Sequence, residues 1–267
     1  MKKQLLALVF LLVPTLALAN SGAKWPLDHK DFDASDSASL QRGAQLFMNY
    51  CMGCHSLQYE RYERLSKGLG IPEDVVMQNL KFDPNAKIGD LMVNAMAPKQ
   101  AKLWFGAVPP DLTLVTRAHG GPDWVYTYLR TFYLDPARPW GVNNKVFPDV
   151  GMPNVLISLQ GVQECVPGSV HAENGGIRRD PLTGKEVLFG EDGKPLNPCG
   201  RLQVTQPGKL TPKEFDGAVY DLVNFLNYIA EPMQLERKHT GIFVLFFLGI
   251  LFVFAWLLNR EYWKDVH

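Results

Sequence analysis

The 267-residue sequence has no surplus of charge of either sign, because its 27 lysines and arginines balance its 27 aspartates and glutamates. A protein that binds nucleic acid is expected to carry a basic surplus, so this balance argues against that class. Cysteine is scarce, at four residues, and only one Cys-x-x-Cys pair is present. A structural zinc site would need a second pair of ligands at similar spacing, which the sequence lacks.

The close cysteine pair, Cys51 and Cys54, is followed at once by His55. This Cys-x-x-Cys-His pattern is the attachment signature of a c-type haem. Each thiol can form a thioether to one haem vinyl group, and the adjacent histidine can serve as an axial ligand of the iron. A structural disulfide and a thioredoxin-like motif are the alternatives, but the latter would follow a strand, whereas residues 39–50 are expected to be helical. The pattern therefore predicts one covalently attached haem c.

The N-terminal segment has the features of a secretory signal. Lys2 and Lys3 precede an apolar core at residues 5–18, and Ala17-Leu18-Ala19 is a small-x-small cleavage site. Residues 1–19 are therefore predicted to be removed, so that the mature chain begins near Asn20. An uncleaved membrane anchor is the alternative, although the apolar run is short for a span.

A second apolar segment, residues 240–259, is predicted to be a transmembrane helix, with a buried core helix as the alternative. Residues 241–258 carry no charge. With residues 240 and 259 added, the helix would span about 30 Å. Trp256 and Trp263 suit an aromatic belt at the membrane interface. Basic residues flank the span equally, so the export signal decides the orientation. We expect residues 20–239 outside the cytoplasm, in a periplasm if the cell is bacterial, and residues 260–267 in the cytoplasm, with the span in the inner membrane between them.

The exported region is predicted to be one domain of mainly α fold with long loops. Residues 39–50 place Leu40, Ala44 and Phe47 on one helical face, with Gly43 beside it for close helix contact. Residues 58–66 are expected to form another short helix. A capping box at residues 211–214 begins a long apolar helix that should end near Glu231. The first and last of these helices would cross and close a haem pocket.

Residues 160–208 are interpreted as an excursion from this domain. Residues 185–189 and 194–196 flank Gly190-Glu191-Asp192-Gly193 and predict a small hairpin. Cys165 and Cys199 bracket the hairpin. In an exported protein two such cysteines favour a disulfide over free thiols, and closing this loop would contribute about 3–4 kcal/mol of stability.

Further stretches of the sequence resemble one family. They are CMGCHSL at 51–57, PPDL at 109–112, RAHGG at 117–121, DWVYTYL at 123–129 and VFPDVGMPNVL at 146–156, followed by the C-terminal anchor. In this order they resemble cytochrome c1, the haem subunit of the cytochrome bc1 complex, particularly in its bacterial forms. The resemblance implies a cytochrome c-type haem domain fixed to the membrane by one C-terminal helix.

The second axial ligand is expected to be a methionine, because a thioether ligand raises the potential of the haem. The candidates, with one histidine added, are Met77, Met92, Met96, Met152 and His119. The family's ligand methionine falls on Met152, within Gly151-Met152-Pro153. Met92 and Met96 lie four positions apart, at helical spacing, and are interpreted as core residues.

Other haem contacts are predicted near PPDL. Arg117 is the candidate partner of a haem propionate, by its charge and its position, while an ordinary exposed arginine is the alternative. Four residues are candidates to wall the porphyrin ring: Pro109, Pro110, Trp124 and Tyr126.

The resemblance implies single-electron transfer from a Rieske iron–sulfur protein to a soluble or membrane-tethered cytochrome c. The complex implied is a proton-translocating quinol–cytochrome c oxidoreductase of a respiratory chain, dimeric, with cytochrome b as a further subunit. This chain would itself form no substrate bonds, so no catalytic residue is predicted. Two alternatives stay open: a stand-alone membrane-tethered shuttle cytochrome, and a haem peroxidase, which would need an accessible iron.

Overall fold

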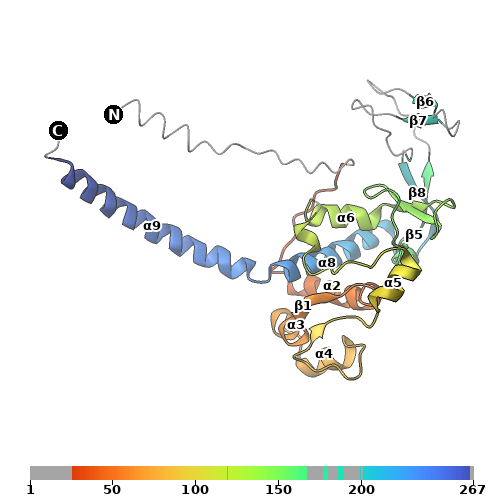
Figure 1. Cartoon of the computed structure of the whole chain (residues 1–267), viewed down its shortest axis with the longest axis horizontal. Helices are drawn as coiled ribbons and strands as arrows, with labels where there is room; N and C mark the ends of the chain where they lie inside the picture. The colour runs from red at the N-terminus through yellow and green to blue at the C-terminus, as the bar shows by residue number, and fades with distance from the viewer. Residues whose placement is uncertain are drawn as a thin grey trace.

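The computed structural model describes residues 26–118, 120–166, 177–179, 186–188, 199 and 201–264. The described chain is mainly helical, which confirms the predicted fold class. Figure 1 shows α2 (Ser37–Tyr50), α6 (Pro122–Arg130) and α8 (Pro212–Ala230) together in the body of the domain, with α9 (Gln234–Tyr262) running away from it. The predicted signal peptide at residues 1–19 lies outside the described residues.

Along the chain, short helices and short strands lie between the two long helices α2 and α8. The helices are α2 (Ser37–Tyr50), α3 (Tyr62–Leu69), α4 (Glu73–Asn79), α5 (Pro98–Phe105), the 3-10 helix η1 (Val115–Arg117), α6 (Pro122–Arg130), α7 (Ile157–Gln160), α8 (Pro212–Ala230) and α9 (Gln234–Tyr262). The strands are β1 (Leu57–Arg61), β2 (Leu91–Met92), β3 (Phe132–Leu134), β4 (Val142–Asn144), β5 (Gly161–Val166), β6 (Ile177–Arg179), β7 (Glu186–Leu188) and β8 (Arg201–Pro207). They pair as antiparallel ribbons β1–β2, β3–β4, β5–β8 and β6–β7.

Helices α2 and α8 begin and end where local signals place them. The Asp36 side chain accepts a hydrogen bond from the Ser39 amide at 3.0 Å and so caps α2. Thr211 and Glu214 form the predicted capping box of α8. The helix ends at Ala230, with Glu231 as its C-cap, which confirms the end expected before Pro232.

The core of the domain lies where α2 crosses α8. A Cβ added at Gly43 would lie 2.6 Å from the Cβ of Phe225, so the absence of a side chain is what permits this approach. Phe47 and Phe225 meet beside it at 5.9 Å between ring centroids, and both are fully buried. Each buried aromatic side chain contributes about 1.5–3 kcal/mol. The guanidinium of Arg42 clamps the Asp221 carboxylate with bonds of 2.6 and 3.0 Å at the edge of the crossing.

The short helix predicted at residues 58–66 is wrong over its first half. Leu57–Arg61 is strand β1, and the helix begins only at Tyr62. Distant groups accept hydrogen bonds from the first amides of the strand: Gln58 donates to the Asp111 carboxylate at 2.7 Å, and Tyr59 donates to the Thr113 hydroxyl at 3.4 Å. Tertiary contacts therefore override a local helical pattern here.

The excursion is built on the ribbon of β5 and β8. Cys165 and Cys199 are joined by a disulfide bond at a Cα–Cα distance of 5.1 Å, inside the range that a disulfide spans. Glu186–Leu188 pairs with Ile177–Arg179. The predicted hairpin partner of this strand, residues 194–196, lies outside the described residues, so that pairing stays a prediction.

Helix α9 has the length and composition of a membrane span. It runs for 29 residues with a mean hydropathy of 2.8 in its most apolar window, and none of that window is buried against the domain. The predicted span, residues 240–259, lies within it. Only residues 231–233 separate α8 from α9.

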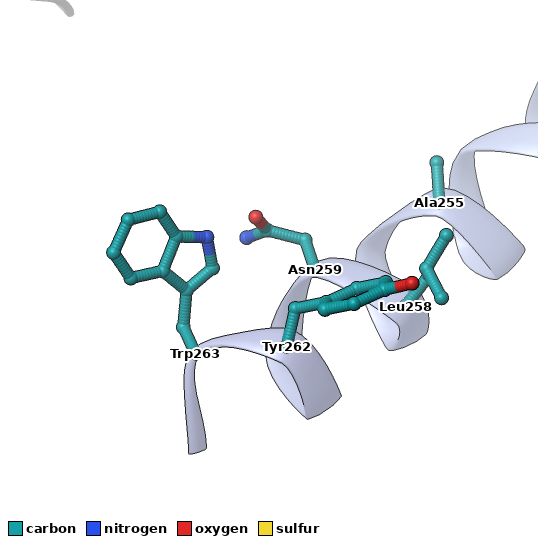
Figure 2. A pocket seen from close by; sticks show the side chains of 5 residues that line it. All are labelled: Ala255, Leu258, Asn259, Tyr262 and Trp263. Carbon is teal, nitrogen blue, oxygen red and sulfur yellow. The ribbon is translucent and has the colours of Figure 1, made fainter. Parts of the chain in front are cut away.

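A shallow hollow lies at the far end of α9, shown in Figure 2. Its lining side chains all project from this one helix: Ala255, Leu258, Asn259, Tyr262 and Trp263. Tyr262 and Trp263 are exposed, as aromatic residues at a membrane interface are expected to be. The hollow is therefore part of the membrane end of the molecule and is remote from the haem motif.

Candidate haem site

The Cys-x-x-Cys-His motif forms a tight turn directly after α2. The amide of Cys51 still bonds to the Phe47 carbonyl at 2.8 Å, as the C-cap of the helix. The amides of Cys54 and His55 then both donate to the Cys51 carbonyl, at 3.0 and 2.9 Å. This turn brings both cysteines and His55 to the wall of one cavity.

The imidazole of His55 is oriented by the PPDL segment. Its Nδ1 lies 2.7 Å from the carbonyl oxygen of Pro110. Because a carbonyl can only accept, Nδ1 carries the proton and Nε2 keeps the lone pair that a metal needs. Burial lowers the pKa of His55, although the bond to Pro110 opposes this, so the ring is held in its neutral, ligating form.

The cavity has a volume of about 360 Å³ and draws its lining from segments far apart in the sequence. Met152 lines it, 97 positions after His55 (152 − 55). Met77, Met92 and Met96 are not among the lining residues. Met92 is buried in the core, as interpreted, but it lies on strand β2 rather than on a helix. The remaining candidate, His119, lies outside the described residues.

Two asparagines that sequence reasoning missed hold the loop that carries Met152. The side-chain oxygen of Asn144 accepts from the amides of Val146 and Phe147, at 2.9 and 3.1 Å. The side-chain oxygen of Asn143 accepts from the amide of Asp149 at 2.8 Å. Asn144 is fully buried. The only signal in the sequence was two adjacent asparagines just before the VFPDVGMP stretch.

Helix α6 supplies an aromatic wall to the cavity. Trp124 and Tyr128 lie four positions apart, stack at 5.0 Å between centroids and both line the cavity, as do Pro109 and Pro110. The prediction of Tyr126 as a wall residue is wrong. Two positions along a helix turn a side chain to the opposite face, so Tyr126 is buried beneath the Arg130 guanidinium, 4.6 Å from its ring centroid.

Tyr128, which the sequence did not single out, reaches Met152 directly. Its hydroxyl donates a hydrogen bond to the Met152 sulfur at 3.3 Å. Burial raises the pKa of Tyr128, so the phenol keeps its donor proton at physiological pH.

Arg117 does not lie at the wall of the cavity, where its predicted contact with a propionate would place it. It ends η1, its guanidinium forms an ion pair with Glu231, and it is not among the residues that line the cavity. Glu231 also pairs with Arg237 in the first turn of α9. The contact between Arg117 and a haem propionate therefore stays a prediction.

The residues of the cavity fit a c-type haem by their chemistry. Cys51 and Cys54 carry free thiols, and burial raises the pKa of Cys51 to about 12, so that this thiol is neutral. The cavity thus joins two unpaired thiols, one imidazole and one thioether inside a mostly apolar lining. Thioether attachment at the cysteines, with His55 and Met152 as axial ligands, would use all four.

Comparisons with known proteins give several matches. The model of the Cytochrome C1 family matches residues 25–164 and 208–266. The cytochrome c1 of Allochromatium vinosum is 53% identical over 267 residues, which cover 100% of both chains. The ammonia monooxygenase gamma subunit of Nitrosomonas europaea is 40% identical over 262 residues, 98% of this chain and 97% of that one. The cytochrome b/c1 of Bradyrhizobium diazoefficiens is 27% identical over 279 residues, 94% of this chain and 37% of that one.

Proposed function

The chain belongs to the cytochrome c1 family, the electron-transfer cytochromes of the bc1 complex, and on this premise we propose its place in the electron path. It carries one covalently attached haem c, accepts single electrons from a Rieske iron–sulfur protein and passes them to a soluble or membrane-tethered cytochrome c. The complex is a proton-translocating quinol–cytochrome c oxidoreductase, dimeric, with cytochrome b as a neighbour.

The observation that carries the proposal is the meeting in one cavity of two thiols, which would attach the porphyrin, with an imidazole and a thioether, which would bind the iron. Cys51, Cys54 and His55 come from the turn after α2, and Met152 comes from a loop 97 positions beyond His55 (152 − 55). A structural disulfide or a redox-active dithiol would require neither the histidine nor the methionine at the same wall. Iron held between a histidine and a methionine is suited to electron transfer rather than to oxygen chemistry.

When bound, a haem supplies reversible one-electron chemistry at its iron. The chain's own residues prepare the site for it. Pro110 fixes the tautomer of His55, so that Nε2 is the nitrogen offered to a metal. Trp124 and Tyr128 cover one side with aromatic surface and exclude water. A dry, apolar surrounding favours the iron state of lower charge, and this raises the potential.

The membrane placement is part of the proposal. Residues 1–19 act as an export signal and α9 spans the inner membrane once. The haem domain then lies in the periplasm and the chain ends in the cytoplasm. The apolar, fully exposed character of α9 supports the span. Mass spectrometry of the mature chain tests the export, because cleavage would leave an N-terminus near Asn20.

Purification of the full chain from membranes tests the function. We expect a pyridine haemochrome spectrum of a haem with two thioethers, and co-purification with a cytochrome b and an iron–sulfur subunit. A stand-alone shuttle would purify without cytochrome b. A peroxidase would bind carbon monoxide rapidly in the reduced native state, whereas a six-coordinate haem would not. Co-purification with monooxygenase subunits, as the name of the Nitrosomonas europaea relative suggests, would also contradict the proposal.

A further inference from the structure

The hydrogen bond between Tyr128 and Met152 is a contact that the proposed electron path does not by itself require. The phenolic hydroxyl donates to the thioether sulfur at 3.3 Å. A thioether sulfur is a weak acceptor, and a buried phenol would ordinarily find a carbonyl or water oxygen. The hydrogen bond from a tyrosine to Met152, the proposed iron ligand, therefore needs an explanation of its own.

The Tyr128 ring is fixed on two sides by aromatic neighbours. It stacks on Trp124 with 5.0 Å between centroids and an interplanar angle of 7°, and it meets Phe132 edge-on at 5.1 Å. These contacts leave the ring little freedom to rotate away from Met152. The donor is thus preorganised rather than transient.

The Met152 loop is tied to the same helix position. The side-chain amide of Asn144 donates to the main-chain carbonyl of Tyr128 at 2.8 Å. The side-chain oxygen of the same residue holds the loop that leads to Met152 through Val146 and Phe147. One buried side chain therefore sets the distance between the tyrosine and the loop that bears the sulfur.

Both bonds to the sulfur can exist together. A thioether sulfur has two lone pairs, so one can bind iron while the other accepts from the hydroxyl. The O–H dipole then points its positive end at the ligand. A positive end near the iron disfavours the more highly charged ferric state, and an outer hydrogen bond of this kind tunes the metal through its ligand.

We propose that Tyr128 is a positioning residue that orients the Met152 sulfur toward the iron and raises the reduction potential of the haem. This inference rests on the proposed function, because it requires a haem with Met152 as an axial ligand. The effect comes from the Tyr128 hydroxyl group alone, so removal of that group should lower the potential.

The test is a redox titration of full-length, membrane-purified protein that carries Tyr128→Phe, which removes only the hydroxyl. We expect the equilibrium to shift toward ferric haem by about two- to tenfold, or about 20–60 mV, since tenfold is about 59 mV for one electron. The methionine–iron absorption band should persist, and imidazole should displace the ligand more readily. The matched control is Tyr126→Phe on the same helix, which does not line the cavity and should leave the potential unchanged.

A second variant keeps the proposal testable if Tyr128→Phe does not fold. Incorporation of 3-fluorotyrosine at position 128 keeps the ring and makes the phenol a stronger donor, so the potential should rise. Unchanged potentials in both variants, with the methionine–iron band intact, would overturn the role of Tyr128. A wild-type protein without covalent haem would instead overturn the proposed function, so the two failures are distinguishable.

Discussion

Gly43 of α2 lies against Phe225 of α8 so closely that a Cβ at position 43 would come within 2.6 Å of the Phe225 Cβ. The two helices that flank the haem cavity are therefore set at a separation that only glycine permits. Because Cys51 follows α2 directly and Leu222 and Leu226 of α8 line the cavity, this separation also sets the shape of the cavity.

We predict that Gly43→Ala lowers the free energy of unfolding by about 1–3 kcal/mol, because the added methyl group overpacks the helix crossing. Urea unfolding of the purified protein measures the change. The matched control is Gly217→Ala on α8, where an added Cβ would meet no atom within 4 Å. This control should be neutral or slightly stabilising, because alanine is the better helix former. Equal stabilities for the two variants would contradict the close contact.

We predict that Met152→Leu abolishes the methionine–iron absorption band and lowers the midpoint potential, because leucine offers no ligand to iron. The fold should survive, since Leu and Met have similar volumes and such swaps cost less than about 1.5 kcal/mol. Met92→Leu is the control, because Met92 is fully buried in the core away from the cavity. A Met152→Leu protein that kept the band and the potential would exclude Met152 as the ligand.

We predict that Asn144→Ala destabilises the protein by about 2–3 kcal/mol. The change removes the acceptor of the Val146 and Phe147 amides, and each unsatisfied buried group costs about 1–3 kcal/mol. The Tyr128 carbonyl loses one bond but still accepts from the Thr131 amide at 3.3 Å. Thermal unfolding measures the loss. Asn79→Ala, at an exposed helix position with one bond to the Val75 carbonyl, should change little. A small effect at both positions would show that the loop does not depend on Asn144.

We predict that Glu60→Gln flattens the pH dependence of stability. Burial raises the pKa of Glu60 above its ordinary 4.5, with Arg64 only partly opposing it. A raised pKa in the folded state gives stability that is present below the unfolded pKa and lost as the pH rises through the folded pKa. The stability of the variant relative to the wild type should therefore rise as the pH increases through the raised pKa of Glu60. Urea unfolding at a series of pH values measures this change, with the exposed Glu73→Gln as control. A Glu60→Gln protein whose pH profile is parallel to that of the wild type would refute the effect.

The parts of the fold that were predictable are those fixed by local chemistry. Thr211 and Glu214 cap α8 through neighbours three positions away, and Pro232 follows its end, so the bounds of α8 followed from the sequence. Helix α2 was expected only from residue 39, whereas it begins at Ser37 because Asp36 caps it. The turn at residues 51–55 was equally local. The uncharged stretch at residues 241–258 marked α9 by composition alone.

The parts that were missed depend on contacts between distant residues. Strand β1 forms because Asp111 and Thr113 capture its amides from more than 50 positions away, which no local pattern encodes. Tyr126 was predicted beside Trp124 as a wall residue, but Tyr128, four positions after Trp124, shares its helical face, whereas Tyr126 does not. Asn144 escaped notice because its side-chain amide donates to the Tyr128 carbonyl, 16 positions away, and so ties the local turn at Val146 and Phe147 to α6.

Only residues 231–239 lie between α8 and the predicted span at residues 240–259, and they limit the distance between the haem domain and the membrane. Residues 231–233 reach about 10 Å when fully extended, and residues 234–239, at the start of α9, add about 9 Å of helix. A cytochrome on so short a stalk cannot travel between donor and acceptor. We therefore expect the partners in this electron path to move, while this haem domain stays in place and relays the electrons between them.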